Sequence, residues 1–220
     1  MNIISIFLQK ISFRIERYSK YYQFREIKKK LGKVTPTSVF KMPEICSCPE
    51  KIYLEESTSI YEGSRFIISP LGEGGRFIFK AHSHAAQGLT VVTGNHIRQV
   101  GLFNLEAAET HDYDVDKDVI VEEDVNIGVG VTLLSGVKVG RGASVGAGSV
   151  CVHNIPPYAI VMGNPAQVVG FVFTPEQIIQ HEEKLYSLED RIPLEKLQKN
   201  YQRYFMNHIS DIAKFTNISI

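Results

Sequence analysis

Residues 118–155 read DVIVEEDVNIGVGVTLLSGVKVGRGASVGAGSVCVHNI and repeat with a period of six. Small or branched residues fill two columns that lie two positions apart, and aspartate or glycine precedes the first column. The first column is Val119, Val125, Val131, Val137, Ala143 and Ser149. The second column is Val121, Ile127, Leu133, Val139, Val145 and Cys151. A period of six is neither the helical nor the strand period, and it is typical of a solenoid built from hexapeptides.

The period has a simple structural interpretation. Each hexapeptide forms a short strand and a tight turn, and three of them close a triangular coil that returns the chain above itself after about 18 residues. Stacked coils pair at the usual interstrand spacing of about 4.8 Å. The first column points into the narrow prism, and glycine takes the corners because positive φ is costly for other residues. Residues 119–154 therefore predict two complete coils.

A weaker array precedes the clean repeat and predicts about two to three further coils. Its column is Leu54, Ile60, Phe66, Ile78, His84 and Thr90. Gly72 lies at the same six-residue spacing, between Phe66 and Ile78. It is part of SPLGEGG (69–75), a glycine-rich segment that predicts a turn. Residues 97–117 are polar and acidic and lack the period. They are too long for a simple turn, so they predict a functional loop.

Both flanks of the repeat predict helices. Residues 1–31 have helical periodicity, and Gly32 with the prolines at 36, 43 and 49 predicts an extended linker. Thr174-Pro175-Glu176 predicts an N-cap with proline at the first helical position, and more helix is expected from Pro193 to about residue 206. The predicted units are an N-terminal helix and linker (1–50), a repeat domain (51–172) that contains the 97–117 loop, and a C-terminal helical extension (173–220).

The N-terminal helix carries apolar residues at helical spacing with basic residues between them. The apolar set is Ile4, Phe7, Leu8, Ile11 and Ile15. One interpretation is a helix that docks on the body or on a neighbouring copy, and the other is a basic amphipathic helix at a membrane surface. We favour docking, because an apolar stripe on a helix usually packs against other protein.

Composition excludes several classes. The chain has 220 residues with 24 basic and 24 acidic side chains, so nothing global indicates a nucleic-acid binder. Three cysteines do not make a disulfide framework and fit a reducing, cytoplasmic location. Cys46 and Cys48 form a C-x-C pair without a second pair, so no metal site is predicted. The sequence has no run of 18 apolar residues, so no transmembrane helix is predicted.

VNIGVGVTLLSGVKVGRGASVGAGSV (125–150), followed by IPPYAIVMGNPAQVV (155–169), resembles the left-handed β-helix acyltransferases of the hexapeptide-repeat family. The resemblance covers residues 52–172. It implies a mainly β fold, a left-handed parallel β-helix solenoid with N-terminal and C-terminal helices. The left hand comes from the resemblance alone, since parallel crossovers are normally right-handed. The resemblance also implies acetyl-CoA as co-substrate and a homotrimer.

Within that family the chain is most similar to bacterial O-acetyltransferases of surface-polysaccharide biosynthesis, which implies transfer to a hydroxyl of a sugar or polysaccharide precursor. The helix TPEQIIQHEEKLY (174–186) resembles theirs. The alternative is a xenobiotic (antibiotic) O-acetyltransferase, which the chain resembles through TGNH (93–96) and the interrupting loop. The resemblance leaves the acceptor unspecified.

The resemblance places the catalytic residue at His96, on the last hexapeptide before the loop. A histidine suits this chemistry because it takes a hydroxyl proton near neutral pH. Asn95 is expected to orient the acceptor hydroxyl or to donate to the oxyanion, and its alternative is a turn residue that tolerates positive φ. By resemblance, the acetyl-CoA contacts are Val129, Ala147, Val152, His153 and Gln167.

The chain departs from the family pattern at two of these contacts. A lysine is common where His153 stands, and a lysine or arginine where Gln167 stands, and those cations meet the cofactor's phosphates. Lys138 and Arg141 could compensate, or they could be ordinary solubilising charges. One of His82 and His84 is expected to line the acceptor cleft, and His111 either reaches the site from the loop or is solvated.

Two further interpretations come from other classes. One is a zinc enzyme of the same fold, such as the γ-type carbonic anhydrases, which needs three histidines converging on the metal. His82, His84, His96 and His111 lack that spacing. The other is a non-catalytic scaffold that retains the solenoid but no longer binds the cofactor, and the missing cations are its only support.

Overall fold

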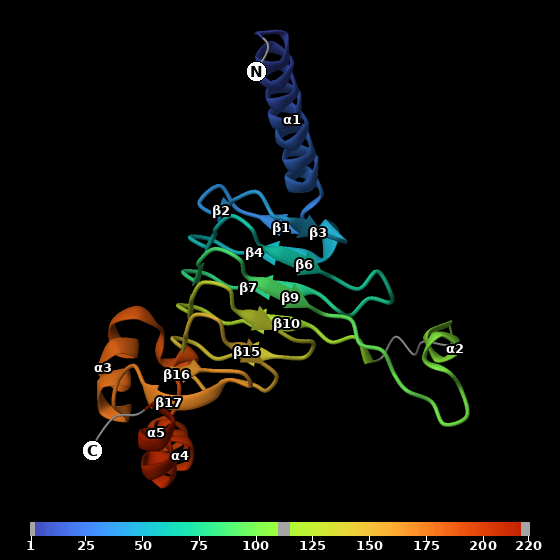
Figure 1. The fold of residues 1–220 in the computed structure, drawn as a ribbon. Helices are drawn as coiled ribbons and strands as arrows, with labels where there is room; N and C mark the ends of the chain where they lie inside the picture. Colours follow the sequence, from blue (N-terminus) through green and yellow to red (C-terminus); the bar gives the residue numbers. More distant parts are fainter. Residues whose placement is uncertain (1–2, 110–114, 217–220) are drawn as a thin grey trace.

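The computed structural model describes residues 3–109 and 115–216, which form a three-sided solenoid of short parallel strands with helices at both ends (Figure 1). Sheet A contains β1 (Lys33–Val34), β4 (Ile52–Leu54), β7 (Phe77–Phe79), β10 (Val119–Val121) and β13 (Lys138–Val139). Sheet B contains β2 (Val39–Phe40), β5 (Ser59–Ile60), β8 (His84–Ala85), β11 (Asn126–Ile127), β14 (Ser144–Val145), β16 (Ala159–Met162) and β17 (Gln167–Phe171). Sheet C contains β3 (Ile45–Cys46), β6 (Arg65–Ile67), β9 (Thr90–Val92), β12 (Thr132–Leu133) and β15 (Val150–Cys151).

From β1 to β15, successive strands visit the three sheets in turn, which confirms the predicted coil. Residues 18 positions apart are paired across neighbouring coils, as Leu133 is with Cys151. The pairs are parallel except for β16 with β17, which is antiparallel and ends the stack. The structure therefore confirms a mainly β fold of stacked parallel strands with flanking helices.

The prism interior is filled by the two columns of the clean repeat. Every member of both columns is at most 2 % exposed. The polar member, Ser149, is satisfied because its hydroxyl donates to the carbonyl of Gly146 at 2.6 Å. The interior therefore explains why only small or branched residues occur at these positions.

The upstream column has a different register from the predicted one. Ile78, His84 and Thr90, three members of the predicted column, are only partly buried and do not fill the interior. The fully buried residues are their neighbours Phe77, Phe79, Ala85, Leu89 and Val91. The loop between β6 and β7 causes the shift, because Phe66 and Phe79 are 13 positions apart, one more than two hexapeptides. Because β6 and β7 are successive strands, the corner between them holds seven residues more than one hexapeptide, and an insertion there breaks no strand pairing.

Residues 33–46 form the first coil, so the predicted extended linker is wrong. Their strands β1, β2 and β3 pair in parallel with β4, β5 and β6. Pro36, Pro43 and Pro49 lie between strands, where the missing N–H of proline interrupts no ladder bond. The strands are two residues long and are separated by prolines, so the sequence pattern does not reveal them.

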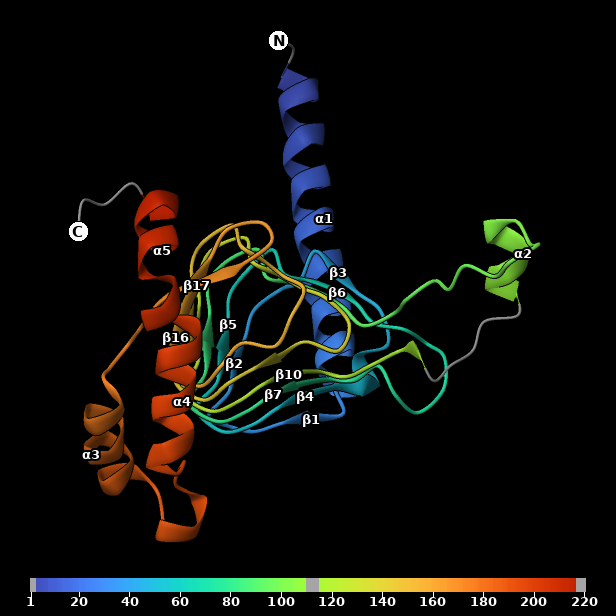
Figure 2. The same cartoon turned by 90° about the horizontal axis from the view of Figure 1, so that it is seen from below.

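The helices flank the solenoid at both ends and α2 lies apart from it (Figures 1 and 2). The predicted N-terminal helix is α1 (Ile3–Lys30). The predicted C-terminal helices are α3 (Pro175–Leu185), which has a capping box at Thr174, and α4 (Leu194–Tyr204). The remaining helical segments are α2 (Asn104–Glu109), α5 (Ile209–Thr216), and the 3₁₀ turns η1 (Pro49–Lys51), η3 (Leu188–Asp190) and η4 (Met206–His208).

A buried carboxylate attaches α3 to the last coils. Glu182 is fully buried and accepts hydrogen bonds from the Tyr158 hydroxyl at 3.0 Å, the Arg141 guanidinium at 3.3 Å and the Ile192 N–H at 2.6 Å. Burial, followed by the charge of Glu182, raises the pKa of Tyr158 well above its usual range. The hydroxyl therefore stays protonated and donates to Glu182 at all ordinary pH values.

A close backbone contact at one corner gives a test of the coil geometry. A Cβ added at Gly140 would lie 2.5 Å from the backbone nitrogen of Pro157 and 2.8 Å from the carbonyl oxygen of Ile155. We expect Gly140→Ala to lower the free energy of unfolding by about 2–3 kcal/mol, because backbone cannot move aside. Urea denaturation measures this loss. Gly170→Ala is the control, since its Cβ meets only the Cδ1 of Ile160 at 3.9 Å, and a change beyond about 0.5 kcal/mol there would contradict the argument.

Candidate functional site

The base of the loop that interrupts the repeat is held by a buried polar cluster. The carboxylate of Asp116, only 5 % exposed, accepts hydrogen bonds from the Ser69 hydroxyl at 2.5 Å and from the Asn95 N–H at 2.8 Å. Thr93 completes the cluster, because its Oγ1 accepts the Ser69 N–H at 2.9 Å. One carboxylate therefore ties the start and the end of the 97–117 loop to the neighbouring 69–75 turn.

Ser135 extends this clamp to the next coil. Its hydroxyl donates to the Thr93 carbonyl at 2.7 Å and accepts the Lys117 N–H at 3.1 Å. Both ends of the loop are thus attached to the clean repeat, whose positions are fixed by the prism interior.

A lysine orders the 69–75 turn from the other side. The ammonium of Lys51 lies 2.9–3.1 Å from four carbonyl oxygens, those of Ser69, Leu71, Gly72 and Gly74. This confirms that SPLGEGG forms a turn, and it adds a positioning residue that the sequence did not indicate. No sequence motif marks Lys51, because its partners are backbone atoms.

The predicted catalytic residue His96 lies just past β9 at the root of the loop, and its side chain is exposed. Asn95 is tied into the root, since its Nδ2 donates to the Val115 carbonyl at 3.1 Å. Its φ is not positive, so the alternative role of a left-handed turn residue is wrong. The structure therefore places His96 at the surface next to a rigid anchor.

Beyond His96 the chain forms an arm that leaves the solenoid (Figure 2). Its described part, residues 97–109 and 115–117, contains α2 and exposes large apolar side chains. Val100, Phe103 and Leu105 are 107 %, 81 % and 76 % exposed. Such exposure on a projecting segment is typical of a surface that another chain covers. His111 lies outside the described residues, so its predicted role is untested.

Two of the predicted cofactor residues, Val129 and Ala147, occupy one corner, where sheet B leads into sheet C. At this corner the two neighbouring coils are in direct contact, because the Gly148 N–H donates to the Val129 carbonyl at 2.8 Å. A Cβ at Gly128 would lie 2.6 Å from the backbone nitrogen of Ala147, so only glycine fits there. Both predicted residues are exposed.

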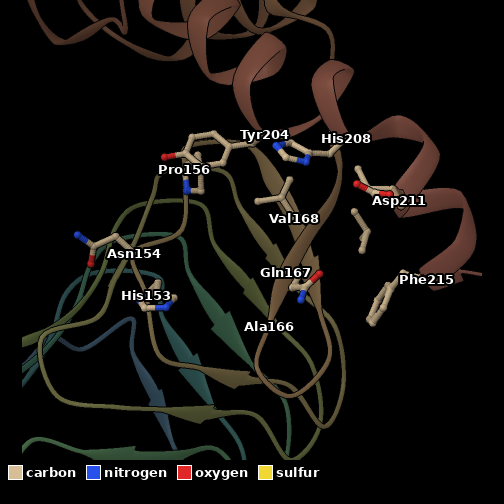
Figure 3. Close-up of a pocket in the computed structure, with 12 residues that line it drawn as sticks. His153, Asn154, Pro156, Ala166, Gln167, Val168, Tyr204, His208, Asp211 and Phe215 are labelled. Carbon is tan, nitrogen blue, oxygen red and sulfur yellow. The ribbon is translucent and has the colours of Figure 1, made fainter.

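The other predicted cofactor residues lie at or near the last coil. His153 and Gln167 line a pocket of about 360 Å³, and Tyr204, His208 and Asp211 line its opposite wall (Figure 3). That wall comes from α4, η4 and α5, which the sequence did not connect with the site. Val152 precedes His153 after β15, on the exposed outer surface.

One protomer does not bring the predicted residues into a single site. His96 and His153 follow strands β9 and β15 of sheet C, whereas Val129 and Ala147 lie at the other end of that sheet's strands. His82 and His84 lie farther away, in the turn before β8 and on sheet B. The imidazole of His84 packs edge to face with the ring of Tyr61, with ring centroids 5.3 Å apart.

The two cations that could compensate at the cofactor site are engaged elsewhere. Lys138 pairs with Glu122 at 2.6 Å. Arg141 pairs with Glu123 at 3.1 Å and Glu182 at 3.3 Å, and its guanidinium lies 4.0 Å from the ring centre of Tyr186. Neither lines the pocket of His153 and Gln167, so their role as compensating cations stays a prediction.

The thiols are poor metal ligands. Burial, with the nearby charges of Cys48 and Glu50, raises the pKa of Cys46 to about 11, and burial raises that of Cys151 to about 12. Metal binding needs the thiolate. Within residues 3–109 and 115–216, no group of three or more His, Cys, Asp or Glu side chains is arranged to hold a metal ion.

The helices also bear on membrane insertion. Among the described residues, 3–109 and 115–216, no helix is both long and apolar enough to cross a membrane.

Comparison with solved structures identifies the fold. A hexapeptide-repeat acetyltransferase from Vibrio cholerae O1 biovar eltor, complexed with acetyl coenzyme A, is 20 % identical, with a TM-score of 0.57 over 73 % of this chain and 78 % of that one. A maltose O-acetyltransferase from Clostridium difficile 630 is 18 % identical, with a TM-score of 0.51 over 67 % and 73 % of the two chains. A galactoside acetyltransferase in complex with coenzyme A is 14 % identical, with a TM-score of 0.50 over 80 % and 88 %.

These likenesses define the class of fold: the chain shares the solenoid of hexapeptide-repeat acetyltransferases. No protein-family model and no curated protein sequence matches it.

The clamp at the loop base can be tested directly. Asp116→Ala leaves the Ser69 hydroxyl and the Asn95 N–H without their carboxylate, and we expect a loss of about 1–3 kcal/mol in unfolding free energy together with faster proteolysis within 97–117. Chemical denaturation and limited proteolysis measure the two effects. Asp118→Asn is the control, because Asp118 pairs with an exposed Arg76 and should cost under about 1 kcal/mol. Equal effects of both substitutions would show that Asp116 is not the anchor.

Proposed function

We propose that this protein is an acetyltransferase that moves an acetyl group from acetyl-CoA to a hydroxyl of a sugar or polysaccharide precursor. The observation that carries the proposal is the position of His96. It stands where the regular solenoid opens into the long 97–117 loop, whose root is anchored by Asp116. The fold shared with acetyltransferases supports the reaction class, and it also supports a left-handed coil.

The reaction asks little of the protein. Acetyl-CoA supplies an activated acyl thioester, and the acceptor hydroxyl must lose a proton as its oxygen attacks. His96 takes that proton on a ring nitrogen and returns it to the departing thiolate, so it ends the cycle unchanged. A positioned base of this kind contributes about 10²–10⁴-fold to the rate. Asn95 supports this step. Its Nδ2 donates to the Val115 carbonyl, which leaves its Oδ1 to accept a hydrogen bond from the hydroxyl of the substrate.

Acetyl-CoA would lie against the corner of Val129 and Ala147 and reach the pocket of His153 and Gln167. Small side chains at the corner let the extended pantetheine arm approach the backbone closely. His153 and Gln167 are polar but carry no fixed positive charge for the phosphates. We therefore expect weaker phosphate binding than in enzymes with lysine or arginine at these positions.

We further propose that the working unit is a homotrimer. His96 and the corner of Val129 and Ala147 lie at opposite ends of the strands of sheet C, so neighbouring copies could bring one copy's histidine to another's cofactor corner. The arm supports this arrangement, because Phe103 and Leu105 expose apolar surface away from their own solenoid. Closed rings of identical subunits are the usual outcome for such a heterologous contact.

Removing the base tests the catalytic assignment. We expect His96→Ala to lower kcat for acetyl transfer by about 10²–10⁴-fold while the oligomer and acetyl-CoA binding persist. Initial rates with free thiol detection and sedimentation velocity measure both properties. His181→Gln, on α3 and packed against Tyr158 and Phe173, is the histidine control and should retain turnover. Near-full turnover of His96→Ala would refute the assigned base.

Restoring a cation tests the cofactor assignment. We expect Gln167→Arg to tighten acetyl-CoA binding by about 5–10-fold, because an added charge-assisted hydrogen bond to phosphate is worth about 1–1.5 kcal/mol at low salt. Isothermal calorimetry at two salt concentrations measures the gain and its screening. Glu189→Gln on η3 also changes the charge by one unit and should leave affinity unchanged. No binding of acetyl-CoA to the wild-type chain at millimolar concentration would overturn the enzymatic proposal and favour a non-catalytic scaffold.

A further inference from the structure

The N-terminal helix extends far beyond the body that it is attached to. With 28 residues at about 1.5 Å each, α1 is about 42 Å long and projects from the first coil (Figure 1). Only its last turns pack on the solenoid. Phe24 and Ile27 are partly buried against the core, and the ring of Phe24 lies 5.9 Å from that of Phe40. The rest of the helix is attached to the solenoid at one end, and nearly all of its described side chains are exposed.

A regular apolar stripe follows the uncovered part of α1. Its members are Leu8, Ile11, Ile15, Tyr18 and Tyr22, which are 58 %, 38 %, 63 %, 64 % and 58 % exposed. Successive members are three or four positions apart in strict alternation, and in the sequence the spacing extends back to Ile4. This is the a/d pattern of a coiled coil, in which Leu8, Ile15 and Tyr22 take position a and Ile11 and Tyr18 take position d.

The attachment of α1 leaves this stripe available. The residues that dock on the solenoid, Phe24 and Ile27, take positions c and f, on the other side of the helix from a and d. The stripe ends where the body begins, because Arg25 and Lys29 occupy the next d and a positions. The seam is therefore confined to the free length of the helix.

The flanking residues permit a parallel pairing of identical helices. In a parallel coiled coil, position g of one helix faces position e of the following heptad on its neighbour. Arg14 would then face Ser19, and Tyr21 would face Glu26. Neither pair brings like charges together. Isoleucine at both a and d, as at Ile15 and Ile11, favours three or more strands over two.

We propose that α1 forms a parallel three-stranded coiled coil with the α1 helices of two further copies of this chain. The occupant of the stripe is thus the same stripe on a second and a third copy. The number of strands rests on the trimer of the proposed function, whereas the contact itself requires no acetyl transfer.

A lipid surface fits α1 less well. A helix that lies on a membrane needs one polar face. Phe13 is 67 % exposed and Ile6 is 37 % exposed, and both lie at position f, on the side opposite to the stripe. The serines at positions 12 and 19 and the basic residues at 10, 14 and 17 lie between the two apolar sides. A seam between helices accounts for the a/d stripe without placing these charges against hydrocarbon.

Assembly of the full-length chain is the first test. Ile11→Ser with Ile15→Ser removes two adjacent seam residues, and we expect the trimer dissociation constant in sedimentation equilibrium to rise at least about tenfold. The matched control is Ile6→Ser with Phe13→Ser, which removes two apolar residues of the opposite face and should leave the constant unchanged.

Cross-linking is the second test and needs no destabilising change. Ile15→Cys lies at a seam position and should form an intersubunit disulfide under mild oxidation, whereas Phe13→Cys should not. The unmodified chain under the same oxidant controls for Cys46, Cys48 and Cys151. The proposal stands only if the seam variant weakens assembly selectively and only position 15 cross-links. Any other combination overturns it.

Binding to vesicles of phosphatidylcholine and phosphatidylserine distinguishes a membrane-surface helix from a coiled coil. If the seam variant keeps its assembly but no longer binds these vesicles, α1 is a membrane-surface helix and the proposal is wrong. The two proposals also fail separately. A seam variant that remains trimeric and active sinks the coiled coil alone, whereas a cross-linked wild-type-like chain without acetyl transfer sinks the enzymatic function alone.

Discussion

The stacking of inward side chains within a narrow three-sided prism is the constraint on which the rest of this structure depends. Each coil repeats the backbone path of the one before it, so an inward residue rests on its equivalents above and below. Aromatic rings fill the first coils, where Phe40, Phe66, Phe77 and Phe79 contact one another in series. Valine, alanine and serine fill the later coils. Because the interior fixes every strand, each corner is placed to within a narrow tolerance, and this makes the corners suitable for chemistry.

Interruptions of the repeat are tolerated only at corners, and this rule concentrates the candidate site. The 69–75 turn and the 97–117 loop both leave from the corner that follows sheet C, in successive coils. The stacked positions Ser69, Thr93 and Ser135 can therefore bond to one another across three coils. Asp116 and Lys51 then attach the irregular backbone to this stack. The 97–117 loop is thereby anchored at both ends, and the exposed His96 has a defined position at its root.

The sequence predicted what local periodicity encodes. The two columns, the terminal helices, the N-cap at Thr174 and the break at His96 all follow from spacing or from turn chemistry. The register after Phe66 could not be predicted, because the corner after β6 holds seven inserted residues, one more than a hexapeptide, and this shifts the count of the inward positions that follow. The first coil was missed since its two-residue strands are stabilised by pairing with β4, β5 and β6, not by their own composition. Lys51 and Asp116 were missed because their partners are distant in sequence.

The two ends of the stack solve the same problem in different ways, and the difference bears on function. A bare end would present unpaired strand edges to other chains. At the first coil, Phe24, Ile27 and Leu31 of the α1 segment cover the core, and the helix then continues outward as a free rod. At the last coil, β17 turns back antiparallel on β16, and α4 and α5 pack beside it. The first solution leaves a surface for other copies of the chain. The second encloses a pocket beside His153 and Gln167, where regular coils alone would leave only a flat end.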